Sequence, residues 1–464
     1  MKNTKTTALL LIGFMLCILC YLPAAQAETR SPFNYAIVMN EETAKDKNWL
    51  EVANVLAAKY PVTKIFTYTE LDNLIEPLTA FSPDYIAFVC NPQQATPEFV
   101  KAASKLNREL ENKPYGTAVW GIVTGYDYAD ALRIARQSKP VSINFGLGGM
   151  LGFIDALPTG VAYMEFYDQR NKWQEKLKGK SVQERSDAPD DHLLPMIKLI
   201  NSNKVDGIWT SGHGQIDSWL TYFPDGPAQI VADEGKLYGL INGDTKDTIN
   251  SNNPKIYLGI GNCLTARIEN VDKSYALAWI HSGGVDQYFG YTVETYYGMM
   301  GWGMADNFFY RGGNYNVAES MFAANQALLL AIDKKLVTDE RKDMEYDRDV
   351  CVVYGDPAWL AKVPASSAKA VAHWDCQLDR RIVGNKIQWE LTVKFNRDID
   401  FSGQSGKDIR PVFMFLPQKI SNPSAEVDLT TIAAYHIASN FVIMQFAGQV
   451  AAGETRKFSF VSEN

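Results

Sequence analysis

Patterns typical of metal sites and of nucleic-acid binding are missing from this sequence. Its 464 residues include 5 histidines and 6 cysteines. Beyond residue 27 there is no Cys-x-x-Cys pair and no His/Cys cluster with zinc spacing, which argues against structural zinc. Acidic residues outnumber basic ones, and the formal net charge is −8. Because an acidic surface repels a phosphate backbone, we do not expect nucleic acid as a partner.

Long hydrophobic runs are missing after the first residues of the chain. Lys2 and Lys5 precede an apolar run at residues 8–22, and the small-x-small sequence Ala25-Gln26-Ala27 follows it. This order predicts a secretory signal peptide at residues 1–27. No later run is long enough to span a bilayer, so we expect no transmembrane segment. The predicted destination is the periplasm, the cell surface or the outside of a bacterium.

Cysteine is scarce in the part of the chain that would remain after export. Cys90 and Cys351 lie in or beside strongly apolar runs, which is typical of buried thiols. Together with Cys263 and Cys376 they are sufficient in number for two disulfides. Cys263 differs from the others, because its Gly-Asn flank and the Leu-Thr-Ala after it are typical of a turn into a helix.

A glycine-rich stretch at residues 144–152 lacks the features of a phosphate-binding loop. Gly146 and Gly148 are not followed by a glycine three positions on, and no P-loop lysine accompanies them. We therefore expect a plain loop. Residues 169–191 are dense in charges, which predicts a solvated helix and a linker.

Strand and helix patterns alternate strictly between residues 35 and 137. Thr96 and Pro97 predict the start of one helix, since threonine caps helices and proline is favoured in their first turn. Strict alternation implies a doubly wound α/β sheet. The expected strands are 35–39, 63–67, 85–90 and 117–123, and the expected helices are 48–60, 97–112 and 127–137.

A second α/β unit follows the charged region. It has expected helices at 274–281 and 316–335 and expected strands at 284–290 and 352–354. We divide the α/β part into an N-terminal sub-domain at residues 28–155 and a catalytic sub-domain at residues 156–363.

The last hundred residues have a different sequence pattern. Residues 366–367 and the alanines around them are typical of a linker. Residues 387–395 alternate between apolar and polar side chains, as a half-buried strand does, and more such runs follow without a long helix between them. We therefore predict an all-β sandwich of immunoglobulin type at residues 364–464.

Two polar motifs follow two short apolar runs inside the second α/β unit. His213 and Gly214 come shortly after residues 205–209, and Cys263 comes shortly after residues 256–260. The carboxyl ends of parallel strands meet at one edge of an open sheet, where such proteins place their chemistry. A cysteine and a histidine at one edge can act as a nucleophile and a proton-transfer group. This arrangement indicates a cysteine peptidase.

These motifs resemble those of the gingipain family, within the clan of caspase-like peptidases. The resemblance rests on His213-Gly214, on Gly261-Asn262-Cys263, on residues 285–301 and on Tyr354-Gly355-Asp356-Pro357. It implies a caspase-like α/β/α sandwich in two sub-domains, followed by the immunoglobulin-like module. It also implies that Cys263 is the nucleophile, that His213 is the general acid/base, and that the backbone N–H groups of Gly214 and Cys263 form the oxyanion hole.

The resemblance extends to the wall of a substrate pocket. Glu294 and Asp286 are the two acidic groups that we consider for its base, since gingipains select basic side chains. Ordinary core aromatics are the alternative for each wall residue. The wall positions are Tyr288, Tyr291, Thr292, Tyr296, Tyr297 and Trp302.

The predicted function is that of an exported cysteine endopeptidase acting on a peptide or protein substrate. We expect that no cofactor is required, and a structural calcium ion is compatible with this interpretation. Two alternatives stay open. The first is a catalytically silent binding protein on the same scaffold, and the second is a peptidyl transferase that passes its acyl-enzyme to an amine.

Overall fold

The computed structural model describes residues 33–463, except 112–113, 165–168, 170, 189–191, 224–225, 312–314 and 403–409. These residues belong to one unit, Pro32–Asn464. The predicted signal peptide at residues 1–27 lies outside the described residues. In the described part of the chain, no helix has the length and apolar character needed to cross a membrane.

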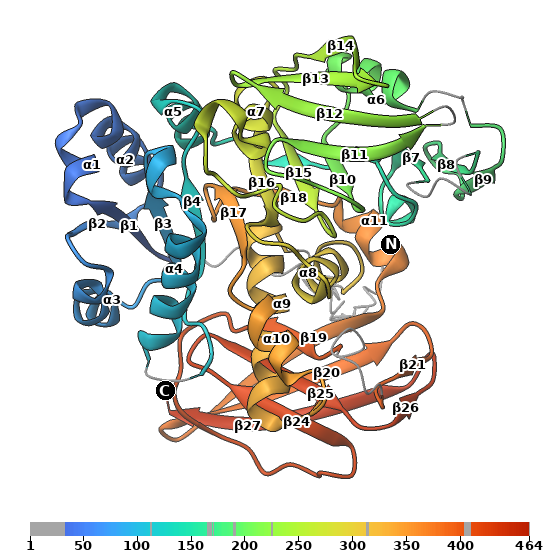
Figure 1. The fold of residues 1–464 in the computed structure, drawn as a ribbon. Helices are drawn as coiled ribbons and strands as arrows, with labels where there is room; N and C mark the ends of the chain where they lie inside the picture. Colours follow the sequence, from blue (N-terminus) through green and yellow to red (C-terminus); the bar gives the residue numbers. More distant parts are fainter. Residues whose placement is uncertain are drawn as a thin grey trace, which may run out of the picture. The chain divides into compact units, whose positions relative to one another are not determined.

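The described residues form a sheet of 12 strands, in the order β2-β1-β3-β4-β17-β16-β15-β10-β6-β7-β8-β9. Figure 1 labels most of these strands. Pairing is parallel except where β17 meets β16 and where β8 pairs with β7 and β9. The strands are β1 (Asn34–Asn40), β2 (Val62–Tyr68), β3 (Tyr85–Val89), β4 (Val119–Val123), β6 (Phe145–Gly148), β7 (Thr159–Tyr163), β8 (Trp173–Lys176), β9 (Gln183–Arg185), β10 (Gly207–Thr210), β15 (Lys255–Gly259), β16 (Val285–Tyr291) and β17 (Cys351–Gly355).

Helices flank this sheet, and the central strands are covered on both faces. β3, β4, β15, β16 and β17 are buried along their whole length, as a sheet between two helical layers requires. The helices are α1 (Glu41–Lys45), α2 (Lys47–Lys59), α3 (Ile75–Phe81), α4 (Pro97–Glu109), α5 (Tyr128–Arg136), α6 (Leu193–Asn201), α7 (Tyr275–His281), α8 (Met299–Phe309), α9 (Val317–Lys334), α10 (Arg341–Asp347) and α11 (Ala365–Val371). The predicted α/β architecture is confirmed.

Local signals set the helix starts. Thr96 Oγ1 accepts a hydrogen bond from Phe99 N at 3.2 Å, so α4 begins at Pro97 as predicted. Asn316 and Glu319 form a capping box at the start of α9, in which each side chain bonds the other residue's backbone N–H. The Thr96 cap was predicted from the sequence, whereas the capping box of Asn316 and Glu319 was not.

The glycine-rich stretch contains a strand, so the prediction of a plain loop was wrong. β6 pairs in parallel with β10 and β7. A Cβ on Gly146 would lie 2.2 Å from Leu157 Cδ1 and 2.6 Å from Trp209 Cζ3. Glycine is needed here because large side chains from other segments fill the space beside this strand.

The charged stretch at residues 169–191 also differs from its prediction. It contributes β8 and β9, two antiparallel strands at one edge of the large sheet, in place of a solvated helix. The predicted division at residues 155/156 falls between β6 and β7, which are neighbours in this sheet.

An antiparallel sheet that the sequence did not predict lies between β10 and β15 in the chain. Its order is β11-β12-β13-β14. It packs on α6, since a Cβ on Gly239 would lie 2.4 Å from Ile197 Cδ1. Its strands are β11 (Ser218–Phe223), β12 (Gly226–Asp233), β13 (Lys236–Ile241) and β14 (Asp244–Ile249).

Antiparallel sheets make up the C-terminal module, as predicted. Their orders are β19-β20-β27-β23 and β22-β25-β24, and Trp389 and Leu391 lie in the core between them. The strands are β19 (Trp374–Val383), β20 (Lys386–Phe395), β22 (Val412–Phe415), β23 (Ser421–Ser424), β24 (Ile432–Ile437), β25 (Phe441–Phe446) and β27 (Thr455–Glu463).

The module is joined closely to the α/β part. The predicted linker contains helix α11. Phe413 and Phe441 pack edge-on against Phe322 of α9, with ring centroids 6.0 and 5.6 Å away. Asn440 Nδ2 donates to the carbonyl of Thr117 at 2.7 Å. These contacts extend one hydrophobic core across the predicted boundary at residues 363/364.

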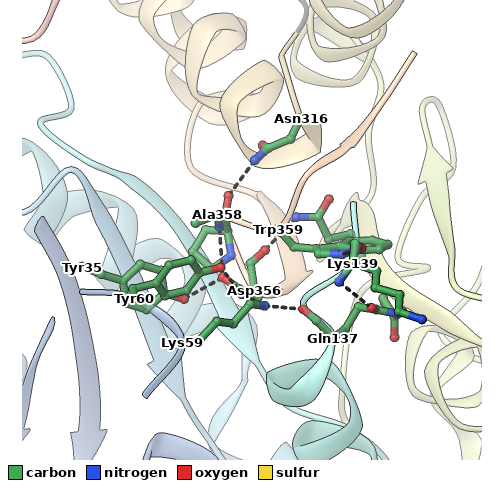
Figure 2. Close-up of polar contacts among 12 residues, drawn as sticks. Tyr35, Lys59, Tyr60, Gln137, Lys139, Asn316, Asp356, Ala358 and Trp359 are labelled. Atoms are coloured by element: carbon green, nitrogen blue, oxygen red, sulfur yellow. Dashed lines mark hydrogen bonds and ion pairs between the residues drawn. The ribbon is translucent and has the colours of Figure 1, made fainter. Parts of the chain in front are cut away.

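The Tyr354-Gly355-Asp356-Pro357 motif forms a buried polar network (Figure 2). The Asp356 carboxylate accepts hydrogen bonds from Tyr35 at 2.7 Å, Tyr60 at 2.6 Å and Lys59 at 2.6 Å. A Cβ on Gly355 would lie 2.3 Å from the carbonyl of Asp286. The motif therefore ties the end of β17 to β1 and α2, which is a structural role.

Candidate active site

The carboxyl ends of β10 and β15 meet at one edge of the sheet. These strands are parallel neighbours (Figure 1). In their register, Thr210 pairs with Gly259. Beyond the strands, Ile260 N donates to the Thr210 carbonyl at 2.9 Å. The segments that carry His213 and Cys263 therefore leave the sheet side by side, as the sequence predicted.

Asn262 fixes the two segments to each other. Its buried side chain accepts a hydrogen bond from Thr210 Oγ1 at 2.6 Å and donates one to the Gly212 carbonyl at 3.1 Å. In the sequence, Asn262 stands out only as part of the Gly261-Asn262-Cys263 motif. Its role in positioning was not predicted, although the polar side chain at the end of an apolar run was a signal for it.

The backbone of the His213 segment is held by β11. Leu220 N donates to the His213 carbonyl at 2.9 Å, and Gln215 N donates to the Ser218 carbonyl at 2.7 Å. The His213 side chain is exposed. Within the described residues its ring makes no hydrogen bond to Cys263. The two predicted catalytic residues thus lie on adjacent segments without being paired.

Gly214 lies directly against the Cys263 segment. A Cβ at position 214 would lie 2.7 Å from the Cys263 carbonyl oxygen and 2.5 Å from the Thr265 methyl group. Glycine is therefore required for the close approach of the two segments. Among the described residues, neither the Gly214 N–H nor the Cys263 N–H donates a hydrogen bond.

The Cys263 thiol is partly exposed and is held by Thr295. The backbone N–H of Thr295 donates to Sγ at 3.2 Å, and Sγ lies 3.6 Å from the Thr295 carbonyl. The next residue, Leu264, has a φ of +60° and donates its N–H to the Val293 carbonyl at 3.1 Å. The turn after Cys263 therefore aligns the thiol with the segment that follows β16.

The other three cysteines lie elsewhere and differ in environment. All four described cysteines are free thiols. Burial raises the pKa of Cys90 and Cys351, and it raises the pKa of Cys376 to about 12. These three thiols are poor nucleophiles, because the thiolate is the reactive form.

Three of the six predicted pocket residues lie in the protein core. Tyr288 stacks on Tyr257 with ring centroids 4.8 Å apart, and the Thr292 hydroxyl donates to the Val350 carbonyl at 2.9 Å. Tyr291 accepts a hydrogen bond from Gly301 N at 2.8 Å. Tyr288, Tyr291 and Thr292 are fully buried, so they present no surface to a substrate in this structure. For these three residues, the alternative of core packing holds.

Of the other three, Tyr296 and Tyr297 lie in the segment that follows β16, and Trp302 lies on α8. Tyr296 is 70% exposed, Trp302 is 36% exposed, and Tyr297 is partly buried. The Tyr296 hydroxyl donates to the Glu294 carboxylate, which raises the pKa of Tyr296. The proposed pocket wall is thereby reduced to Tyr296, Tyr297 and Trp302.

Asp286 has a structural partner. Its carboxylate is 2% exposed, forms an ion pair with Arg133 and accepts a hydrogen bond from Gln137 Nε2 at 3.3 Å. Asp286 is therefore unsuited to the base of a substrate pocket. Glu294 is exposed and stays the acidic group considered for this role.

The four other histidines have positions apart from this site. His281 pairs with Asp130 at 2.8 Å near the surface, and His192 stacks on Tyr163. His373 and His436, in the C-terminal module, stack on Tyr310 and Tyr115 of the α/β part. Among the described residues, no group of three or more His, Cys, Asp or Glu residues is placed to hold a metal ion.

Comparison of the sequence with protein-family models and with curated proteins gives no match. Among solved structures, the chain is similar to one titled "Crystal structure of the Arg specific cysteine proteinase gingipain R (RGPB)". The TM-score is 0.46 and the sequence identity is 12%, over 94% of this chain and 99% of that chain.

Proposed function

We propose that the chain is an exported, gingipain-like cysteine endopeptidase with Cys263 as nucleophile and His213 as general acid/base. One observation carries the proposal. The parallel strands β10 and β15 bring the two segments together, and Gly214 lies against the Cys263 backbone. Export rests on the predicted signal peptide.

In the first step, the Cys263 thiol gives its proton to His213, and the resulting thiolate attacks the carbonyl carbon of the scissile peptide bond. A C–S bond forms and the carbonyl oxygen becomes an oxyanion. Among the residues that the structure describes, the N–H groups of Gly214 and Cys263 have no acceptor, and they lie on adjacent segments, which supports their role in holding this charge.

The intermediate then collapses, and the peptide C–N bond breaks. Protonated His213 gives its proton to the leaving amine, which leaves an acyl-enzyme on Cys263. Water attacks this thioester as His213 removes its proton, and the C–S bond breaks. The carboxylate product leaves, and the thiol and the histidine return to their starting states.

The dyad must close for this sequence to run. His213 is exposed, so its ring is free to turn toward the thiol when a substrate is bound. Catalytic hydrogen bonds are often long in sites without substrate and shorten in the complex.

One observation favours the alternative of a catalytically silent binding protein. Sγ of Cys263 is hydrogen-bonded to the backbone of Thr295 and not to the ring of His213. If this arrangement persists with substrate, the chain binds peptide without cleaving it.

The test is turnover of a fluorogenic peptide library varied at the residue before the scissile bond, under reducing conditions. Wild-type protein is compared with Cys263→Ala and with Cys376→Ala as the matched cysteine control. The proposal predicts cleavage by wild type and Cys376→Ala and none by Cys263→Ala. Absence of cleavage by all three, with peptide binding retained, would favour the silent binding protein.

A further inference from the structure

The segment at residues 293–298, which we call the thiol-holding segment, contacts Cys263 Sγ through the backbone N–H and carbonyl of Thr295. Thr295 N–H donates to Cys263 Sγ at 3.2 Å. The carbonyl of that same peptide unit belongs to Glu294, and it accepts a hydrogen bond from the Tyr346 hydroxyl at 2.8 Å. Tyr346 and Cys263 Sγ therefore bind the two opposite edges of one peptide unit, its carbonyl and its N–H.

This geometry couples the two side chains mechanically. A peptide unit is planar and almost always trans, so its N–H and C=O point in opposite directions and rotate together. Fixing the Glu294 carbonyl therefore fixes the direction of the Thr295 N–H. An N–H that points at sulfur stabilises the thiolate over the thiol, because the hydrogen bond is stronger to the charged form.

The ends of the thiol-holding segment are also anchored. At its start, Leu264 N donates to the Val293 carbonyl at 3.1 Å, and within the segment Gly298 N donates to Thr295 Oγ1 at 3.0 Å. α10 supplies a second anchor beyond the segment, where the Asp347 carboxylate accepts a hydrogen bond from Met300 N at 2.6 Å. The segment is therefore held on both sides. Its central peptide unit, Glu294–Thr295, is bonded by one further side chain, through the Tyr346 hydroxyl.

We propose that Tyr346 is a positioning residue for the Cys263 nucleophile, acting through the Glu294–Thr295 peptide unit. Its contribution to turnover rests on the proposed peptidase function, whereas its contribution to thiol reactivity does not. Tyr346 lies on α10, 83 positions after Cys263, and it is 40% exposed. Its hydroxyl is therefore removable without opening a cavity in the core.

The test is the rate at which iodoacetamide alkylates Cys263 in the folded Tyr346→Phe protein. The extent of alkylation at each cysteine is measured by mass spectrometry of its peptides after the reaction is stopped. Because one neutral hydrogen bond is lost, we expect alkylation at Cys263 to slow about two- to tenfold. The control is Tyr126→Phe, which removes another exposed tyrosine hydroxyl, bonded to Asp272 at 2.6 Å. It should alkylate at the wild-type rate.

Turnover gives the second readout. In Tyr346→Phe, kcat should fall by a similar factor while KM and the melting temperature stay near the wild-type values. A merely structural role would lower the melting temperature and leave the alkylation rate of Cys263 unchanged.

The outcomes separate the two proposals. Slower alkylation in Tyr346→Phe with no peptide cleavage by wild type would support the positioning role and overturn the peptidase. Cleavage by wild type with equal or faster alkylation in Tyr346→Phe would overturn the positioning role and keep the peptidase.

Discussion

Asn262 Oδ1 lies 2.6 Å from Thr210 Oγ1, at the point where two parallel strands leave the sheet. The same side chain reaches the Gly212 carbonyl at 3.1 Å. This one amide thus connects the end of β10, the turn before His213 and the residue before Cys263.

Replacing this amide should affect activity more than stability. Asn262→Ala leaves the Gly212 carbonyl without its donor, which costs about 1–3 kcal/mol of the free energy of unfolding. It also releases the His213 turn, and we expect kcat/KM to fall about 100-fold, because small misplacements of catalytic groups are costly. The comparison is Asn107→Ala, a buried asparagine with backbone bonds to Ala118 at 2.9 Å. Equal activity losses in both variants would contradict a special role for Asn262.

Adding one carbon at position 214 should separate the two catalytic segments. Gly214→Ala places a Cβ 2.7 Å from the Cys263 carbonyl oxygen, so the segments must move apart. We expect kcat/KM to fall at least 100-fold. Gly448→Ala is the control, since φ is +67° there and no atom lies within 4 Å of the new Cβ. It should lose about 1 kcal/mol of stability and keep its activity.

Acid should destabilise the protein through His373. Burial lowers the pKa of this side chain to about 4, with Arg311, Arg397 and Arg410 opposing its protonation and Asp306 favouring it. The Arg397 guanidinium lies 3.2 Å from Nε2, which accepts a hydrogen bond when the ring is neutral.

The direction of this pH effect on stability follows from the pKa of His373 in the folded and unfolded chains. The pKa of His373 is lower in the folded chain than in the unfolded chain, so the unfolded chain binds the proton first. The stabilisation is complete above about pH 6.5 and is lost as the pH falls toward 4, by about 3 kcal/mol at most. Urea unfolding across this range should show a shallower decline for His373→Phe. Identical declines in the two proteins would contradict the prediction.

Removal of the C-terminal module should damage the α/β part. Phe413 and Phe441 cover Phe322 of α9, and truncation after residue 363 exposes that surface to water. We expect the truncated protein to melt at a lower temperature and to aggregate. As a milder test, Phe441→Ala should lose about 3–5 kcal/mol. A truncated protein with an unchanged melting temperature would show that the two parts are independent.

Features that depend on neighbours in sequence were predicted well. Apolar runs located the ends of β10 and β15, and Thr96 located the start of α4. The segments of His213 and Cys263 are adjacent because parallel strands share an edge, which is a general property of such sheets. Activity and the roles of these residues stay predictions.

Features that depend on distant residues were not predicted. β6 exists as a buried strand because Trp209, from another strand, fills the space beside its glycines. Tyr288 and Tyr291 lie in a strand that is buried on both faces, where sequence periodicity does not separate core from pocket. The contact between Tyr346 and the peptide unit beside Cys263 joins segments that no local pattern connects.

The Asp356 network has a consequence for the order in which the chain assembles. Tyr35 and Lys59 are among the first described residues, whereas their acceptor is 321 and 297 positions further along. During synthesis, a lysine and two tyrosines of the first α/β elements have no Asp356 acceptor until the end of the α/β part has been made. The centre of the sheet therefore closes late, by joining the two ends of the α/β region, and folding depends on this long-range closure.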